Sequence, residues 1–337
     1  MKYPSFLKKN DTIGVPAPSD AARDSKKANK YKHAVKYFED EGYKLKLSKN
    51  LYTSVMARSA DAKTRGKELN EMFKSTDIDF ILCAAGGEFL VECLPYVDFD
   101  LIKDNPKYVA GFSDPTCLLF PITTKYDIAT IYGNNFGSFG MEKFSQSHYD
   151  FLDLITGKKF EFKSYSLYEG ERVKQVTGLE PYNLKKRVKW KTLDGKDIKL
   201  KGRIIGGCFD LISDIAGTKY DGMKEFNERY KKDGIIWFFD NCEFSMEATI
   251  RTLWKMKELD YFKYCKGVVF GRFGVEVSGL GYDVKKCLED SILNELKIPV
   301  IYDADISHKA QSLPILIGSI ATIECKNNKG TISFRME

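Results

Sequence analysis

The feature that most constrains the fold is an alternation of two periods in the first 150 residues. Short apolar runs of strand length recur in this region, at residues 12–15, 43–47, 78–83 and 108–111. Segments whose apolar residues lie three or four positions apart separate these runs, and the first such set is Ala28, Tyr31, Ala34, Val35 and Phe38. Strands that alternate with helices predict a parallel sheet covered on both faces. We therefore expect an N-terminal parallel α/β domain of Rossmann-like type, with its functional groups at the carboxyl ends of the strands.

The second half of the chain predicts another α/β domain, with a strand-rich core. Its pattern gives an apolar strand at 234–239, a helix at 246–259, a strand at 267–271, a helix near 290–296 and a strand-rich tail. A chain of 337 residues suits two domains of about 150 residues each. We expect an N-terminal domain at 1–160, a linker with a basic hairpin at 161–203 and a C-terminal domain at 204–337.

Positive charge is concentrated between the two expected domains. The chain has a net charge of +6, and the stretch from Lys174 to Arg203 holds ten lysines or arginines against three acids. Such a stretch can contact nucleic acid or an anionic substrate. Apolar residues lie on either side of Asp194-Gly195, however, which is typical of a hairpin. We favour a solvated hairpin, and we expect no nucleic-acid partner.

The sequence gives no indication of a membrane or export segment. No apolar run approaches the roughly 18 residues needed to span a bilayer, and the first residues contain no apolar core of signal-peptide length. We expect a soluble globular protein of the cytoplasm, without a membrane partner.

Eight cysteines are scattered along the chain without a C-x-x-C pair, and several lie inside apolar runs. This pattern predicts buried thiols and neither a disulfide framework nor a zinc site. Cys117, four residues after Ser113, is a conceivable nucleophile, but its apolar helical run favours a core thiol.

Ser113 is the strongest candidate for a nucleophile. It lies in Ala110-Gly-Phe-Ser-Asp-Pro, directly after a predicted strand, and Pro115 is well placed to begin a helix. The segment is therefore predicted to be a strand–turn–helix corner that projects the hydroxyl clear of the sheet. Backbone amides at the start of the helix can receive negative charge there.

A serine nucleophile needs a base and an acid that orients the base. The chain has three histidines; His33 lies among lysines and His148 in a polar stretch, so we expect both to be solvated. His308 follows an apolar strand and a short loop, and is the candidate base. Asp240 ends the apolar run 235–239 and is the candidate acid, with Glu243 as the alternative.

Together these residues resemble the LD-carboxypeptidase family of serine peptidases, which includes the microcin C immunity peptidases. The resemblance covers nearly the whole chain in order. It is carried by Leu7-Lys-Lys-Asn-Asp-Thr-Ile-Gly-Val, the helix from Ser59 to Phe73, Ala85-Gly-Gly, Gly111-Phe-Ser-Asp-Pro-Thr, Gly206-Gly-Cys, Gly217-Thr-Lys-Tyr, Phe239-Asp-Asn-Cys-Glu, Arg251-Thr-Leu-Trp, Ser307-His and Leu313-Pro-Ile-Leu-Ile-Gly.

The resemblance implies roles for individual residues. Ser113 would be the nucleophile and His308 the base, and the backbone amides of Gly87 and Asp114 would stabilise the oxyanion. We expect the substrate to lie near four residues, Gly86, Glu88, Asn134 and Trp190. Trp190 could stack on a purine, but we favour a hairpin side chain that packs against its domain. No metal or organic cofactor is implied, and homodimers are expected.

This chain departs from the family pattern at three positions. Asp240 stands where the family usually has glutamate, Ala85 where a charged residue is common, and Ser307 where a glycine often precedes the histidine. The shorter acid supports catalysis only if the backbone brings Asp240 closer to His308 than a glutamate would need.

Two functions of different classes follow from these observations. The leading hypothesis is a serine carboxypeptidase that cleaves an amide near a free carboxylate, in a murein peptide or in a peptidyl-nucleotide of the microcin C type. The alternative is a binding protein that keeps the peptide site but has lost turnover. A nucleotide-binding dehydrogenase ranks far below both, because no G-x-G-x-x-G follows the first strand.

Overall fold

The computed structural model describes residues 1–276 and 278–337 and shows a mixed α/β chain that divides into two units. Unit 1 contains Met1–Lys159, Arg172–Tyr182 and Pro314–Leu316. Unit 2 contains Phe160–Glu171, Asn183–Leu313 and Ile317–Glu337. The expected linker at 161–203 is therefore not a separate segment, because its central part belongs to unit 1 and its two ends to unit 2.

The sheet of unit 1 has the order β14-β5-β4-β3-β1-β2 among the described residues. The pairs from β1 to β5 are all parallel, as the sequence predicts. The strands are β1 (Thr12–Val15), β2 (Lys44–Leu47), β3 (Phe80–Leu82), β4 (Tyr108–Gly111), β5 (Thr130–Tyr132) and β14 (Ile315–Ile317). The carboxyl ends of the five strands β1 to β5 therefore lie at one edge of the sheet.

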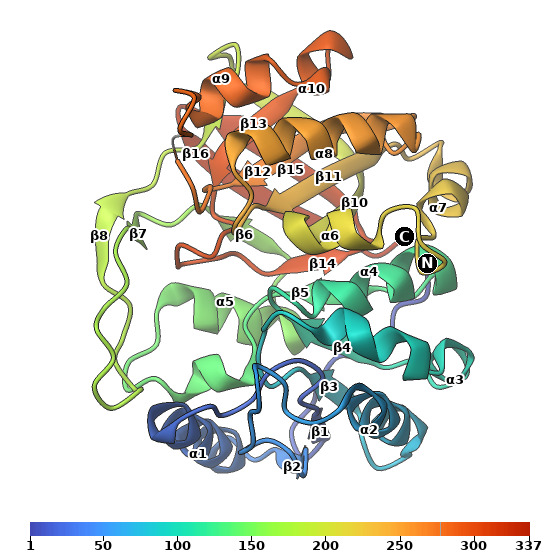
Figure 1. Ribbon diagram of the computed structural model, residues 1–337, viewed down its shortest axis with the longest axis vertical. Helices are drawn as coiled ribbons and strands as arrows, with labels where there is room; N and C mark the ends of the chain where they lie inside the picture. The colour runs from blue at the N-terminus through green and yellow to red at the C-terminus, as the bar shows by residue number, and fades with distance from the viewer. Residues whose placement is uncertain (277) are drawn as a thin grey trace. The chain divides into compact units, whose positions relative to one another are not determined.

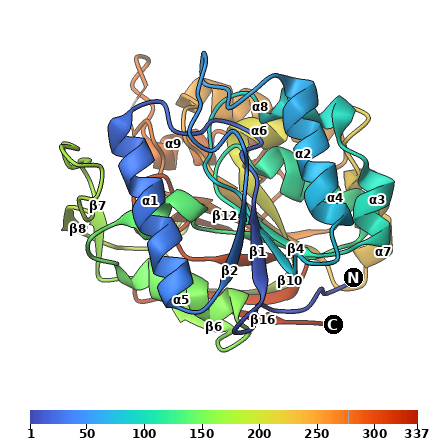
Figure 2. The same ribbon diagram turned by 90° about the horizontal axis from the view of Figure 1, so that it is seen from below.

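Helices cover this sheet, and α1 and α2 flank β1 and β2 on either side (Figure 1, Figure 2). The predicted apolar face of the first helix is largely confirmed, since Tyr31, Ala34 and Phe38 are buried. The helical turn between β3 and α3, at Leu90–Tyr96, is a 3-10 helix. The helical elements are α1 (Ser25–Asp40), α2 (Ala62–Lys74), η1 (Leu90–Tyr96), α3 (Phe99–Asp104), α4 (Thr116–Tyr126), η2 (Phe136–Gly140) and α5 (Gln146–Ile155).

Unit 2 is built on a mixed sheet with the order β6-β16-β15-β10-β11-β12-β13-β9. Its four central strands, β10 to β13, run parallel, and the flanking pairs are antiparallel. The strands are β6 (Glu161–Lys163), β9 (Lys191–Thr192), β10 (Ile198–Cys208), β11 (Ile235–Asp240), β12 (Cys265–Gly271), β13 (Val300–Ala304), β15 (Ile320–Lys326) and β16 (Lys329–Arg335).

Helices α6 and α8 cross one face of strands β10 to β12 (Figure 1). The apolar run of β11 is buried at every position, so this strand forms the centre of the core of unit 2. The helices of this unit are α6 (Phe209–Ile215), α7 (Met223–Tyr230), α8 (Met246–Glu258), α9 (Val284–Glu289) and α10 (Ile292–Glu295).

The expected hairpin around Asp194-Gly195 is wrong in its pairing. The turn is present, and Gly195 has the positive φ of 73° that such a turn needs. The strands on either side do not pair with each other, because β9 pairs with β13 whereas β10 pairs with β11 and β15. A separate antiparallel ladder joins β7 (Leu167–Glu169) to β8 (Leu184–Arg187).

A helix that crosses a membrane must be both long and apolar. Among the helices that the structure describes, none has both the length and the apolar character that such a span needs.

Candidate active site

Ser113 lies at a sharp corner between β4 and α4 of unit 1. Its φ of +72° is in the left-handed region, which a non-glycine residue rarely adopts and which recurs at functional sites. Two hydrogen bonds brace the corner: the amide of Ser113 donates to the phenolic oxygen of Tyr132 at 3.3 Å, and the amide of Thr116 donates to the carbonyl of Ser113 at 2.9 Å. The strand–turn–helix corner predicted from the sequence is confirmed.

The glycine turn at Gly86 and Gly87 packs directly against this corner. A Cβ atom at Gly86 would lie 2.9 Å from the Cβ of Ser113 and 3.1 Å from the carbonyl oxygen of Phe112. A Cβ atom at Gly87 would meet the side chain of Ser19. Both positions therefore require glycine because the backbone passes too close to its neighbours for any side chain.

The carboxylate of Asp114 ties three segments of unit 1 together. It is fully buried and accepts hydrogen bonds from the hydroxyl of Ser19 and from the amide of Leu90, the latter at 2.9 Å. Burial raises the pKa of this carboxyl, although the hydrogen bonds act in the opposite direction. The loop after β1, the glycine turn and the serine corner thus share one buried acceptor.

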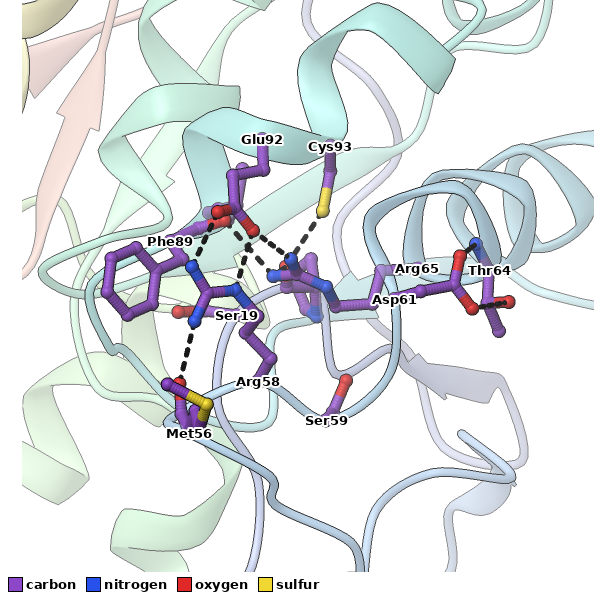
Figure 3. Close-up of polar contacts among 12 residues, drawn as sticks. Ser19, Met56, Arg58, Ser59, Asp61, Thr64, Arg65, Phe89, Glu92 and Cys93 are labelled. Carbon is purple, nitrogen blue, oxygen red and sulfur yellow. Dashed lines mark hydrogen bonds and ion pairs between the residues drawn. The ribbon is translucent and has the colours of Figure 1, made fainter.

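A buried arginine holds two of these segments, the loop after β1 and residues 89–92, which follow the glycine turn. The guanidinium of Arg65 is fully buried and donates to the carbonyls of Pro18 and Phe89 and, at 2.9 Å, to the carboxylate of Glu92. Figure 3 shows Arg58 and Arg65 converging on Glu92, with the ring of Phe89 beside Arg58. Arg65 was not predicted from the sequence. Its helix was noticed only because the segment from Ser59 to Phe73 resembles the family.

In unit 2, Asp240 and His308 form a close pair. Asp240 ends β11 and is fully buried, whereas the side chain of His308 is 14% exposed. The Oδ1 atom of Asp240 accepts from the Nδ1 atom of His308 at 2.9 Å and from the backbone amide of His308 at 3.2 Å. The alternative acid, Glu243, is exposed. Asp240 therefore makes the contact that an orienting acid needs.

The surrounding loops hold this pair in place. Ser307 is buried, and its hydroxyl donates to the carbonyl of Arg272 at 2.8 Å and accepts from the amide of Lys309 at 3.0 Å. A glycine at this position could make neither bond. In the loop that follows Asp240, the amides of Cys242 and Glu243 donate to the carboxylate of Asp210, each at 3.1 Å. No feature of the sequence pointed to Asp210.

The electrostatics of the pair favour a charged imidazole. Burial alone would lower the pKa of His308, but the charge of Asp240 and its hydrogen bond outweigh burial and raise the pKa to about 10. In its neutral form, with the Nδ1 proton held by Asp240, the ring can take a proton through Nε2. The pair is therefore a base that is held in one orientation and that is strongly basic.

The other predicted site residues have different surroundings. Glu88 is exposed, and the side-chain amide of Asn134 donates to the carbonyl of Ser147 at 3.4 Å. Trp190 is fully buried in unit 2, and its indole nitrogen donates to Asp305 at 3.0 Å. Its ring packs over Gly330. The predicted stacking on a purine is therefore not supported, because the ring is enclosed by its own unit.

His33 is exposed, as predicted, but the expectation of a solvated His148 is wrong. His148 is fully buried, stacks on Phe144 with ring centroids 4.9 Å apart and caps α5 through Ser145. Burial lowers its pKa to about 4, so it is neutral at physiological pH. The polar neighbours that suggested solvent exposure are its capping partners.

The cysteines agree with the prediction of buried thiols at most positions. None of the eight forms a disulfide in the described part of the chain, and six are buried. Cys117 is among the buried thiols and lies below Asp114, with its sulfur 3.8 Å from the carboxylate. Within residues 1–276 and 278–337 no group of three or more histidines, cysteines or acids is arranged to hold a metal ion.

Two features found here are typical of serine hydrolases. One is a serine with left-handed backbone geometry after a parallel strand, and the other is a buried acid hydrogen-bonded to a histidine. Comparison with known families narrows this class. Residues 13–133 match the LD-carboxypeptidase N-terminal domain and residues 201–323 match the LD-carboxypeptidase C-terminal domain. The chain therefore belongs to the LD-carboxypeptidase family, and the protein is a serine peptidase.

Relatives of known name extend over almost the whole chain. The microcin C7 self-immunity protein MccF of Escherichia coli is 28% identical, over 96% of this chain and 93% of its own length. A probable murein peptide carboxypeptidase of Bacillus subtilis is 26% identical, over 98% of this chain and 93% of its own length. The crystal structure of an MccF-like protein from Bacillus anthracis superposes with a TM-score of 0.85 and 26% identity, and the match covers 100% of both chains.

Proposed function

We propose that the protein is a carboxypeptidase that cleaves an amide next to a free carboxylate, with Ser113 as nucleophile, His308 as base and Asp240 as the orienting acid. The observation that carries the proposal is the hydrogen bond of 2.9 Å between Asp240 and His308. This bond holds the ring of His308 in the tautomer and orientation that a general base requires. The carboxylate of Asp240 also stabilises the imidazolium that forms during the reaction.

The reaction is acyl transfer in two steps. The Oγ atom of Ser113 attacks the carbonyl carbon of the amide while His308 takes the hydroxyl proton, and the same proton then passes to the departing amine. An ester between Ser113 and the acyl group remains. Water attacks this ester, again with His308 as base, and releases the carboxylic acid and the serine.

The oxyanion of each tetrahedral intermediate needs donors. We assign this role to the backbone amides of Gly87 and Asp114. Two observations support the assignment: the glycine turn packs against Ser113, and the buried side chains of Asp114 and Arg65 bind the backbone of Leu90 and Phe89, directly after that turn. Each such donor contributes about 3 kcal/mol in the transition state.

Labelling with a serine-directed fluorophosphonate tests the nucleophile and the base together. We expect covalent labelling of Ser113, located by mass spectrometry of the digested protein. The label should disappear in Ser113→Ala and fall strongly in His308→Ala, while a His33→Ala control reacts like the wild type. Wild-type protein that stays unlabelled at every pH would favour a binding protein without turnover.

Two kinds of substrate follow from the relatives. One relative is named for murein peptides and another for microcin C7 self-immunity, so we propose a murein tetrapeptide or a peptidyl-nucleotide. Incubation with a murein tetrapeptide and with an aspartyl-adenylate analogue, followed by chromatography of the released group, distinguishes them. The burial of Trp190 removes the argument from purine stacking. Labelled protein that cuts neither compound would contradict the carboxypeptidase assignment while leaving a serine hydrolase.

We further propose that the protein is a cytoplasmic homodimer. The proposal rests on the sequence resemblance. Light scattering of the purified chain at several concentrations tests the dimer, and cell fractionation tests the location.

A further inference from the structure

Unit 2 contains a cavity of about 400 Å³ at the edge of its sheet, beside β13 and β9. Every lining residue belongs to unit 2. The walls come from the ends of β12 and β13, from β7 and β8 and from the start of α9. This volume falls within the range of small-molecule sites, roughly 300–1,000 Å³.

Cations outnumber acids in the described lining. Five basic side chains line the cavity, namely Arg187, Lys189, Lys191, Arg272 and Lys285. Three acids accompany them, namely Glu276, Asp283 and Asp303.

Most of these charges already have partners. Lys191 pairs with Asp303 at 2.8 Å, Lys285 with Glu289 and Arg272 with the buried Asp305, outside the lining. The acids are also occupied: Glu276 pairs with Lys309, and Asp283 caps α9.

Two exposed cations remain without a carboxylate partner in the described chain, Arg187 and Lys189. They lie two residues apart, one at the end of β8 and one just after it. The cavity therefore has cations on its rim whose charge is not neutralised by the protein.

Aromatic rings hold two further cations against the cavity. The guanidinium of Arg272 lies 4.5 Å from the ring centre of Tyr168, and the ammonium of Lys191 lies 5.6 Å from that of Tyr302. Both tyrosines line the cavity. Such contacts help to keep a cation in place, in addition to the ion pairs of Arg272 with Asp305 and of Lys191 with Asp303. The local field is also visible at Glu276, whose pKa is lowered by its bond with Lys309 and further by Lys186 and Lys191.

The cavity gives a role to the basic stretch Lys174–Arg203, which takes no part in the proposed peptidase reaction. Arg187, Lys189 and Lys191 come from the segment Lys174–Arg203, where ten cations face three acids in sequence. The expected solvated hairpin does not form there. A cavity lined by three members of this segment gives its charge a local role.

We propose that this cavity binds a small ligand with two or more anionic oxygen groups, carboxylate or phosphate, and that Arg187 and Lys189 contact them. Guanidinium and ammonium groups bind such oxygen atoms through charge-assisted hydrogen bonds. The cavity is too large for one isolated anion and suits a molecule in which several are linked. The proposal concerns binding alone and does not depend on cleavage of an amide.

Titration calorimetry of the full chain with two probes tests this binding. Pyrophosphate supplies linked phosphates and tricarballylate supplies linked carboxylates, so the stronger probe identifies the chemistry. We expect saturable binding of at least one probe with one site per chain. The double variant Arg187→Ala/Lys189→Ala should weaken binding about tenfold or more, because it removes both proposed charge-assisted bonds.

The matched control is Lys199→Ala/Lys201→Ala, which removes the same charge from exposed positions of β10 in the same basic stretch, outside the cavity lining. It should bind like the wild type. Equal weakening in both double variants would show a response to net charge alone and overturn the proposal. So would the absence of saturable binding of either probe, or binding of a short single-stranded DNA without binding of the small anions.

Discussion

At the residue scale, the acid that we propose, Asp240, is one methylene shorter than the glutamate that the sequence resemblance leads us to expect, and the backbone compensates. The amide and the ring of His308 both donate to the same oxygen of Asp240, so residue 308 itself lies close to the end of β11. Ser307, the second departure from the family pattern, helps to hold the loop there through its hydroxyl. The two departures therefore belong to one local arrangement, in which a short acid and a braced loop occur together.

This arrangement predicts the response to changes of the acid. Asp240→Asn should lower kcat/KM roughly 10³- to 10⁴-fold, because the amide cannot stabilise the imidazolium and favours the wrong tautomer. Asp240→Glu, which restores the common family residue, should also be less active, because the longer side chain has no space in this buried contact. Activity of the two variants and of His308→Ala is compared on one substrate. A glutamate variant faster than the wild type would show that the short acid limits catalysis.

The raised pKa of His308 predicts an alkaline pH profile. Only the neutral imidazole accepts a proton, so the reaction of Ser113 with a fluorophosphonate should accelerate as pH rises, about tenfold per pH unit below the pKa. The rise should continue well above 6.5, the ordinary value for histidine, toward 10. In Asp240→Asn the rise of the rate should occur at lower pH, because the negative charge that raises the pKa of His308 is absent. A wild-type rate that is already constant at pH 7 would contradict this prediction.

How much of the site the sequence could predict differs from residue to residue. Ser113 was predictable because glycine, proline and a preceding apolar run define its corner locally. His148 was mispredicted because its polar neighbours are hydrogen-bond partners, a relation that only the folded helix end reveals. Asp210 was missed because it acts on amides 32 and 33 residues further along the chain.

At the element scale, one buried side chain couples α2 to the loop after β1 and to the segment that follows the glycine turn. Arg65 projects from α2 to the loop after β1 and to the glycine turn, where it binds two backbone carbonyls. The sequence predicted α2 and β4 from their own apolar patterns. It could not predict their coupling, nor that β9 pairs with β13, because pairing depends on residues distant in sequence.

The pair of arginines on Glu92 offers a test of this coupling. Arg65→Met should destabilise the protein by about 3 kcal/mol, because it leaves two carbonyls and a carboxylate without their buried donor. Arg58 binds the same carboxylate from a more exposed position, so Arg58→Met should have a much smaller effect. Urea denaturation measures both. Equal losses of stability in the two variants would show that the shared contact with Glu92, and not the buried carbonyls, accounts for the effect.

At the scale of the whole molecule, the two units are not two consecutive stretches of chain. The sequence predicted two consecutive domains, 1–160 and 204–337, joined by a linker, because apolar periodicity gives the order of elements and not their partners. In the structure, Pro314–Leu316 leaves the C-terminal half and belongs to unit 1, where β14 is the edge strand beside β5. The stability of unit 1 should therefore depend on residues near the end of the chain.

A matched pair of variants tests this dependence. Leu316 on β14 and Ile323 on β15 are both fully buried, and they lie only seven residues apart. Truncation of either to alanine should cost about 2–5 kcal/mol. The effects should appear in different places, which hydrogen exchange followed by mass spectrometry can resolve. Leu316→Ala should speed exchange in β4 and β5, whereas Ile323→Ala should speed it in β10 and β16, the neighbours of β15. If Leu316→Ala instead loosened only β10 to β12, β14 would be stabilised by unit 2, and the two consecutive domains expected from the sequence would describe the folding units better.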